Sequence, residues 1–451
     1  MGIPAAVRLP ACRAAFILIA CLSVAAFGQG FVHPGLLHTQ ASLDRAKTQV
    51  DAHAEPWLSG WNRLAANSHA SAAWKARPSD TVFRGTGTPE NYANLYTDIA
   101  AAYANALYWR LKGDTAHAQA AVRILDAWSA KLKVIDGTSD KYLAAGIYGY
   151  ELANAVELMR GYPGWNGFPQ SRDLLRTVFY PMNHDFLTGH NGACISHYWA
   201  NWDLVNMASM LAIGILADDR AVYDEAVAYF KTGAGNGSIR NVVWYLHPGG
   251  LGQWQEAGRD QGHSLLGPAI LGSICEMAWS QGDDLYGYDD DRALKGFEYV
   301  AKYNLGDSVP YAAYDNCDHV KQDTISAVGR GELRPGWELI YNHYVVRKGL
   351  AAPNCQRFAE KVRPEGGGGD YGPNSGGYDQ LGYGTLMATL PQGTFLLPRR
   401  SGRVPTPLDP RLPTLDASGR LWPAGGPANV QASGWLRPAE VRFQLPLPDL
   451  K

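Results

Sequence analysis

The chain has 451 residues and a formal net charge of -2, from 40 basic and 42 acidic side chains. This balance gives no overall positive field, which argues against nucleic-acid binding and requires that local cations hold any acidic ligand. Roughly 420 residues remain after a predicted leader, enough for one large core or two moderate ones.

Residues 1–28 have the features of a signal peptide. Arg8 and Arg13 precede an apolar run from Phe16 to Phe27 that ends in small residues. The run is short for a membrane span, and no later stretch approaches about 18 continuous apolar residues. We therefore expect an exported protein, secreted or periplasmic, with no membrane attachment after cleavage.

Apolar residues then recur with the period of α-helices. Ile99, Tyr103, Leu107 and Leu111 are each four residues apart and share one helical face. The same pattern returns at 122–132, 143–154, 204–215 and 223–230. Glycine and aspartate separate these segments, as expected where one helix ends and the next is capped.

Helices joined by short turns pack as antiparallel hairpins. A solenoid is not indicated because the sequence has no repeat of fixed length. We predict an all-α fold over residues 29–395, an (α/α) toroid formed as an incomplete barrel of helical hairpins. Residues 396–451 are rich in proline and predict an extended, non-catalytic tail.

The chain has six cysteines, two of them in the leader. The remaining four, Cys194, Cys275, Cys317 and Cys355, permit three disulfide pairings in an exported protein. Cys275 lies in an apolar helical pattern and is expected to be a buried thiol. No cysteine or histidine spacing matches a zinc site, so no metal or cofactor is predicted.

The densest polar cluster runs from Gln253 to His263, just before an apolar helix. Glu256, Arg259 and His263 are three and four residues apart and would share one face if the segment were helical. The alternative is a solvated helix start whose charges pair with one another.

Two further clusters are candidates for the same site. Residues 190–203 place His197 and Asn201 four residues apart at the start of a helix, although histidines in such positions also serve as core residues. In residues 329–344, Arg334, Trp337, Glu338 and Tyr341 would share a helical face. The two aromatic residues there are equally suited to the core.

The clusters resemble the alginate lyase superfamily. Residues 94–128, an Ala-rich helix followed by Gly113-Asp114 and a second helix ending Leu125-Asp126-Ala127-Trp128, resemble its helical hairpin. His197-Tyr198-Trp199-Ala200-Asn201-Trp202 resembles its Asn/His-bearing helix. Residues 252–263 with 274–286 resemble a newer branch that acts on alginate or glucuronan. The resemblance implies a polysaccharide lyase that cleaves a uronic-acid polymer by β-elimination and leaves 4,5-unsaturated ends.

One departure from the superfamily leaves a role open. Older members carry Asn-His directly before Ser-Tyr-Trp, whereas this chain has Ile195-Ser196-His197-Tyr198-Trp199. The residue that neutralises the substrate carboxylate is therefore Asn201, His197 or Asn191.

β-Elimination requires that the uronate carboxylate be neutralised before the C5 proton is removed. Asn and Arg donors do this by stabilising the developing enolate, an effect of several kcal/mol. We assign this role to Asn201 with Arg259, and proton abstraction to His263. Tyr341 is the predicted base or acid, with Arg334 as the cation that lowers its pKa. If Tyr341 is buried, Tyr245 and Tyr314 are the alternative candidates for this base or acid role.

The predicted partner is an acidic polysaccharide, held by residues that flank the four predicted catalytic residues. The substrate-binding candidates are His197, Trp202, Trp254, Gln255 and Arg334. The aromatic members, together with Trp199, offer flat surfaces to sugar rings.

Two other functions use the same residues. A glycoside hydrolase on a similar toroid would need two carboxylates, drawn from Asp203, Glu256 and Asp260, and would release no unsaturated product. A non-catalytic carbohydrate-binding protein would bind the polymer without turnover.

Overall fold

The computed structural model describes residues 30–85, 90–371 and 378–391, together with Gly2 and the backbone of two short strands. Its two compact units are residues 1–401 and 402–451. In the second unit, β7 (Thr414–Leu415) and β8 (Leu421–Trp422) pair antiparallel. The predicted leader and the rest of the predicted tail lie outside the described residues.

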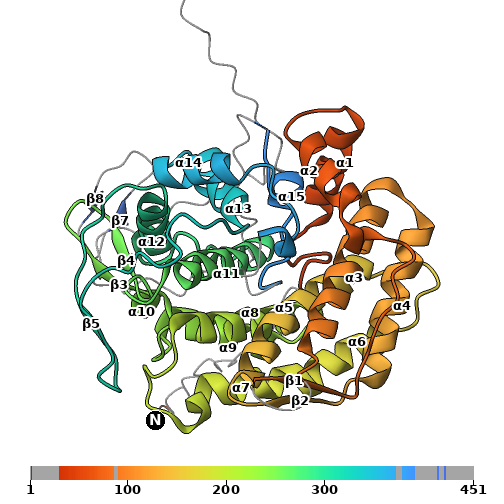
Figure 1. Ribbon diagram of the computed structural model, residues 1–451, viewed down its shortest axis with the longest axis horizontal. Coiled ribbons are helices and arrows are strands. Elements are labelled where there is room, and N and C mark those ends of the chain that lie inside the picture. Colours follow the sequence, from red (N-terminus) through yellow and green to blue (C-terminus); the bar gives the residue numbers. More distant parts are fainter. Residues whose placement is uncertain are drawn as a thin grey trace, which may run out of the picture. The chain divides into compact units, whose positions relative to one another are not determined.

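The first unit is built almost entirely from helices, which confirms the predicted fold class (Figure 1). Its longer helices are α1 (Gln40–Asp51), α2 (Trp57–Ala66), α3 (Tyr92–Lys112), α4 (Thr115–Lys131), α5 (Lys141–Met159), α6 (Phe168–Leu174), α7 (Tyr180–Gly189), α8 (Ala200–Leu216), α9 (Arg220–Thr232), α11 (Gln261–Ser280), α12 (Tyr288–Asn304) and α14 (Pro353–Val362). The short ones are α10 (Ile239–Val242), α13 (Trp337–Tyr341) and α15 (Gly384–Met387). No helix among the described residues has the length and apolar content needed to cross a membrane.

Contacts between helices close a ring. Along the chain α3 packs on α5, α5 on α8, α8 on α11 and α11 on α13. The ring then closes through α15, which contacts α13 on one side and both α1 and α2 on the other. Outer helices cover this ring, with α4 on α3, α9 on α8, and α12 on α11. The arrangement is the predicted toroid.

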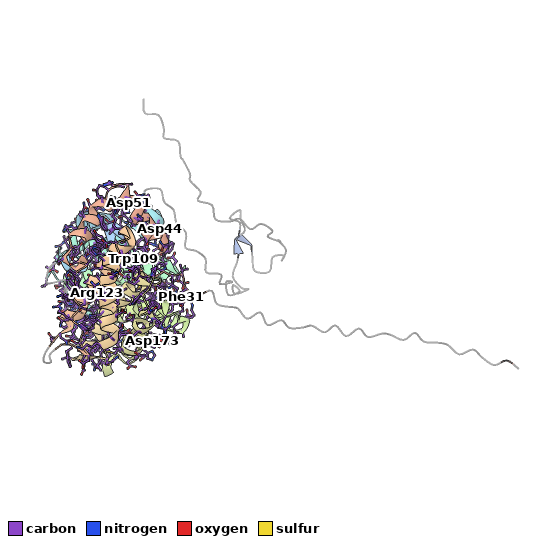
Figure 2. The ribbon with its side chains drawn as sticks, turned by 90° about the vertical axis from the view of Figure 1, so that its right-hand side faces the viewer. Phe31, Asp44, Asp51, Trp109, Arg123 and Asp173 are labelled. Carbon is purple, nitrogen blue, oxygen red and sulfur yellow. A yellow bond between two sulfur atoms is a disulfide. The ribbon has the colours of Figure 1, made fainter. Side chains whose placement is uncertain are left out.

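Burial separates the inner helices from the outer ones. Every residue of α8 is buried, and α5 is buried along nearly its whole length, as expected for helices that are apolar all round. The outer helices α9 and α14 bury one face only. Helices α3 and α4 form an antiparallel hairpin on one side of the domain, and Figure 2 shows this side with Trp109 of α3 and Arg123 of α4 labelled.

Short strands lie at the helix ends. β1 (Thr81–Arg84) pairs parallel with β2 (Val134–Gly137). β3 (Val243–Leu246) pairs antiparallel with β4 (Gly252–Trp254), and β5 (Tyr314–Asp315) pairs antiparallel with β6 (Lys321–Gln322). The last two hairpins flank the segment that leads into α11.

Small residues allow α5 and α8 to pack closely. A Cβ atom at Gly146 would lie 2.8 Å from the backbone nitrogen of Asn206 and 2.6 Å from a methyl group of Val205. Because the nearest backbone belongs to the fully buried α8, it has no room to move away. Glycine at this position therefore sets the distance between the two helices.

Gly146→Ala is expected to lower the free energy of unfolding by about 1–3 kcal/mol, the usual cost of overpacking a core. Gly189→Ala is the matched control, since Gly189 is exposed at the end of α7 and its Cβ would meet nothing within 4 Å. Urea denaturation of both variants measures the difference. Equal stabilities would contradict this account of the α5–α8 interface.

Candidate active site

The starts of α8 and α11 meet around a buried carboxylate. Glu256 is 0% exposed; its Oε2 accepts the backbone N–H of Asn201 at 3.2 Å, and its Oε1 pairs with Nη1 of Arg259 at 2.8 Å. Burial raises the pKa of Glu256, although Arg259 and His263 act in the opposite direction. This carboxylate therefore joins the backbone of one predicted site residue to the side chain of another.

Asn201 and Arg259 present two hydrogen-bond donors side by side. Nη1 of Arg259 lies 3.4 Å from Oδ1 of Asn201. The other nitrogens of the two groups, Nδ2 of Asn201 and Nη2 of Arg259, have no hydrogen-bond partner among the described residues. The Arg259 guanidinium also lies over the Trp199 ring, 5.3 Å from its centroid. A cation and an amide held in this way suit a carboxylate ligand.

His263 is held by an aspartate at the start of α11. Oδ2 of Asp260 lies 2.7 Å from Nδ1 of His263, and Oδ1 of Asp260 caps the helix by accepting the His263 backbone N–H at 2.8 Å. Burial acts to raise the pKa of Asp260, but the hydrogen bonds from His263 outweigh it and the pKa is lowered. An ionised aspartate on Nδ1 favours the tautomer that leaves Nε2 as a proton acceptor.

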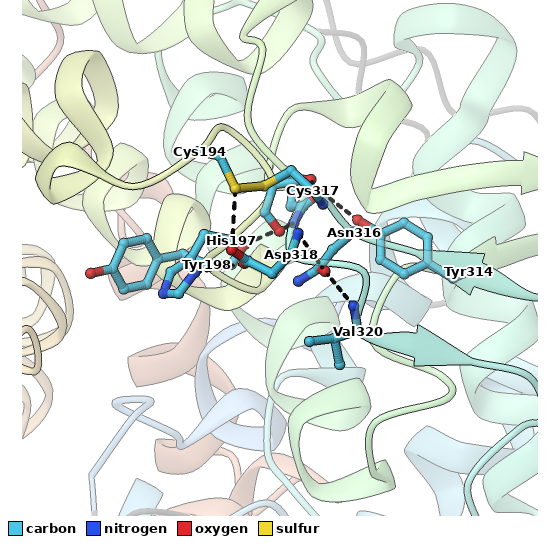
Figure 3. Close-up of a disulfide and its surroundings, with 10 residues drawn as sticks. Cys194, His197, Tyr198, Tyr314, Asn316, Cys317, Asp318 and Val320 are labelled. Atoms are coloured by element: carbon cyan, nitrogen blue, oxygen red, sulfur yellow. Dashed lines mark hydrogen bonds and ion pairs between the residues drawn. A yellow bond between two sulfur atoms is a disulfide. The ribbon is translucent and has the colours of Figure 1, made fainter.

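A disulfide ties the β5–β6 hairpin to the segment before α8 (Figure 3). Cys194 is bonded to Cys317, and the backbone N–H of Cys317 donates to Oγ of Ser196 at 2.8 Å. Beside the disulfide, Nδ1 of His197 lies 2.7 Å from Oδ2 of Asp318. This is one bond of one of the three complete pairings considered from the sequence; its second bond is not formed, because Cys275 and Cys355 are both buried free thiols. Cys275 is thus a buried thiol, as predicted.

This hairpin brings Tyr314 to the cluster. The Tyr314 hydroxyl donates to Oδ1 of Asn236 at 2.9 Å, while Nδ2 of Asn236 donates to the backbone oxygens of Ser196 and Tyr198. Burial raises the pKa of Tyr314 and outweighs the hydrogen bonds with Gln255 and Asn236, which act to lower it, so the phenol keeps its proton at neutral pH. Among the tyrosines considered from the sequence, Tyr314 is the one for which the structure records an electrostatic interaction with Glu256, the carboxylate that holds Asn201 and Arg259.

Three predicted substrate-binding residues lie mainly inside the protein. Trp254 is 0% exposed and packs against Phe297, so it offers no surface to a sugar ring. Gln255 is buried, and its Oε1 accepts the backbone N–H of Ala200, which positions the start of α8. Trp202 is largely buried against Tyr198 and Phe186. His197, in contrast, is exposed, so it stays a candidate binding residue.

The structure does not pair Tyr341 with Arg334. Arg334 is buried and pairs with Oδ2 of Asp379 at 3.0 Å. The cation over the Tyr341 ring is Arg363, 5.8 Å from its centroid, and burial raises the pKa of Tyr341 although Arg363 opposes the shift. Arg334 and Tyr341 do not share a helical face, because α13 begins only at Trp337 and Arg334 lies before it. The residue directly before the helix, Gly336, has a left-handed conformation with φ of 107°.

The other two predicted helical faces are also interrupted. α11 begins at Gln261, so Glu256 and Arg259 lie in the preceding turn, where they nevertheless pair. α8 begins at Ala200, so His197 lies outside the helix and does not share a face with Asn201.

Sequence reasoning missed Asn236. It lies in the stretch Gly235-Asn236-Gly237, where a Cβ at Gly235 or Gly237 would come within 2.4 Å of Asp203. An asparagine enclosed by such glycines in a long loop is a signal that the backbone approaches other groups closely there.

Asp260→Ala is expected to lower the free energy of unfolding by about 1 kcal/mol, because α11 loses its cap. Asp260→Asn keeps a capping oxygen and should lose less. Because the folded-state pKa of Asp260 is lowered, the stability advantage of the unaltered protein over the Asp260→Asn variant should be full at neutral pH. It should shrink as pH falls below the ordinary value of about 4. Urea unfolding at several pH values measures both effects, and a pH-independent difference would contradict them.

Solved structures share this fold. Alginate lyase A1-III from Sphingomonas species A1 superposes with a TM-score of 0.51 at 14% identity, covering 79% of this chain and 98% of that chain. A histidine-to-alanine variant of alginate lyase A1-III complexed with a tetrasaccharide gives 0.52 at 16% identity, covering 80% and 98%. A tyrosine-to-phenylalanine variant complexed with a tetrasaccharide gives 0.52 at 17%, covering 82% and 99%. Such low identities establish the fold alone.

Sequence comparison supplies the family. No curated protein sequence matches this chain. The family model for alginate lyases matches residues 60–310, more than half of the chain, and this span includes Asn201, Arg259 and His263. The resemblance drawn from the sequence is thereby confirmed: the chain belongs to the alginate lyase family.

Proposed function

We propose that the protein is a polysaccharide lyase that cleaves an alginate-type uronate polymer by β-elimination at the Asn201–Arg259–His263–Tyr314 cluster. The observation that carries this proposal is the pair of available donors, Nδ2 of Asn201 and Nη2 of Arg259, beside a histidine held by Asp260. Family membership supports the same reaction class.

The first task of the cluster is to neutralise the substrate carboxylate. Two N–H donors directed at its oxygens stabilise the enolate that forms when the C5 proton leaves. Glu256 fixes both donors, since it bonds the Asn201 backbone and the Arg259 guanidinium. This arrangement favours Asn201 over His197 as the neutralising residue, because His197 is engaged with Asp318.

The second task is proton transfer. His263 is 37% exposed and its Nε2 is available to accept the C5 proton, while Asp260 stabilises the imidazolium that results. Tyr314 remains protonated and is suited to protonate O4 as the glycosidic bond breaks. In this proposal the acid role predicted for Tyr341 passes to Tyr314.

The hydrolase alternative finds little support in the arrangement of carboxylates. Asp203 is fully buried, with its oxygens on His190 and the backbone N–H of Gly237. Both oxygens of Glu256 are also occupied. Both oxygens of Asp260 are bonded to His263 as well. All three candidate carboxylates are thus engaged within the protein, whereas glycoside hydrolysis of this kind uses two carboxyl groups at the scissile bond.

Export is part of the proposal. The leader predicted over residues 1–28 and the Cys194–Cys317 disulfide both fit an oxidising compartment outside the cytoplasm, such as the periplasm or the medium.

Tyr314→Phe and His263→Ala should each reduce formation of ultraviolet-absorbing unsaturated ends from alginate by a factor of about 10²–10⁴, because each removes a proton-transfer group. Tyr341→Phe is the matched control and should retain near-complete activity. Circular dichroism establishes that all three variants are folded. If Tyr341→Phe loses activity while Tyr314→Phe retains it, the general acid is Tyr341. Binding of alginate without turnover by the unaltered protein would refute the lyase proposal.

A further inference from the structure

The amide of Asn236 connects the Tyr314 hydroxyl to the backbone before α8. Asn236 is 5% exposed, and its Oδ1 accepts the Tyr314 O–H at 2.9 Å. Its Nδ2 donates to the backbone oxygen of Ser196 at 3.1 Å and to that of Tyr198 at 2.8 Å. Both the oxygen and the nitrogen of this buried amide have protein partners, so the side chain is suited to hold Tyr314 and not to bind a substrate.

A buried carboxylate holds the turn that carries Asn236. Asp203, in the first turn of α8, is 0% exposed, and its Oδ2 accepts the backbone N–H of Gly237 at 2.8 Å. Its Oδ1 lies 3.1 Å from Nε2 of His190, the residue that follows α7. The hydroxyl of Tyr229, in α9, lies 3.2 Å from the same nitrogen. Groups from three helices therefore meet where the turn is attached.

Glycine on both sides of Asn236 allows this close contact. A Cβ at Gly235 would lie 2.3 Å from Oδ2 of Asp203 and 2.5 Å from the Tyr229 hydroxyl. A Cβ at Gly237 would lie 2.4 Å from the Cβ of Asp203. A larger residue at either position would push the turn away from the carboxylate, and the amide of Asn236 would move with it.

Tyr314 needs an anchor of this kind if it is the general acid. It lies in β5, which has two residues and pairs with the two residues of β6. A strand this short restricts a side chain weakly, whereas a displacement of about 1 Å near a reacting group can lower a rate by about 10²-fold. The hydrogen bond to Asn236 restricts the hydroxyl itself.

We propose that Asn236 is a positioning residue for the Tyr314 hydroxyl, and that Asp203 holds the turn from which Asn236 acts. The inference rests on the proposed function, because it is there that Tyr314 is the general acid. Neither residue contacts the substrate. Asp203 is enclosed between α7, α8 and α9, and Asn236 acts through the phenol.

A double-mutant cycle on alginate tests the positioning role. Asn236→Ala is made in the unaltered protein and in Tyr314→Phe, and kcat and KM are measured from the formation of unsaturated ends. In the unaltered background kcat should fall about 10- to 100-fold, with KM changed less than about twofold. In Tyr314→Phe the same substitution should change kcat less than about twofold, because the hydroxyl that Asn236 holds is already absent. An unchanged kcat in Asn236→Ala, or an equal fall in both backgrounds, would overturn the proposal.

Two variants of Asp203 test the support of the turn. Asp203→Ala should lower kcat about 10-fold or more, because the turn loses its bond to α8. Asp203→Asn keeps an oxygen for the Gly237 N–H and should retain more of the activity than Asp203→Ala. Full activity in Asp203→Ala would overturn the role of Asp203, and circular dichroism establishes that each variant is folded. If Asp203→Ala does not fold, full activity in Asp203→Asn together with an additive Asn236→Ala effect would overturn the proposal.

A matched control separates positioning from stability. Asn105, in α3, is also a fully buried asparagine whose Nδ2 donates to the backbone oxygens of a distant segment, those of His69 and Ser71. Asn105→Ala should lower the free energy of unfolding and leave kcat unchanged. A fall in kcat as large as that in Asn236→Ala would show that losing any buried amide has this effect, and would overturn the proposal.

Nuclear magnetic resonance of protein labelled with [ζ-¹³C]tyrosine gives a readout that needs no turnover. The Tyr314 signal is the one missing from Tyr314→Phe. It should shift in Asn236→Ala and keep its position in Asn105→Ala. An unshifted Tyr314 signal in Asn236→Ala would overturn the proposal even if the protein is a lyase. If the unaltered protein cleaves no uronate polymer, the lyase proposal fails, while a shifted signal still supports the link between Asn236 and Tyr314.

Discussion

The candidate site depends on the two bonds of the buried Glu256 carboxylate, one to each side of the site. The carboxylate bonds the backbone at the start of α8 and the guanidinium of Arg259 before α11, two segments separated by more than fifty residues in sequence. Removing two charges from water is costly, and the cost is offset only when the partners are held in good geometry. The closely packed inner helices provide that geometry, because α8 is buried on every side.

A second constraint brings the tyrosine to this centre. The disulfide between Cys194 and Cys317 and the His197–Asp318 pair attach the β5–β6 hairpin to the segment before α8 (Figure 3). Asn236 connects the same segment to the Tyr314 hydroxyl. The site is thus assembled from three parts of the chain. Each part is held by bonds other than those to a substrate, so the donors are arranged before a substrate arrives.

Helical periodicity was sufficient to predict the fold class, because segments such as 143–154 and 204–215 are apolar with a clear helical repeat and lie within α5 and α8. Asn201 and Arg259 could be proposed because polar residues are dense around them. Tyr314 could not be chosen over Tyr341, since its position depends on a disulfide between residues 123 apart. Trp254 and Arg334 were misjudged because an aromatic or a cation near a polar cluster can equally point into the core, and local sequence does not reveal which.

The central claim is that Asn201 and Arg259 neutralise the substrate carboxylate. Its most direct test compares wild-type and Asn201→Ala protein on alginate and on alginate whose carboxylates are methyl-esterified, because esterification removes the charge that Asn201 is proposed to stabilise. We predict that the substitution lowers kcat/KM by about 10²–10³ on the free acid, typical of losing such a donor. On the ester the loss should be much smaller. An equal loss on both substrates would contradict carboxylate neutralisation by Asn201.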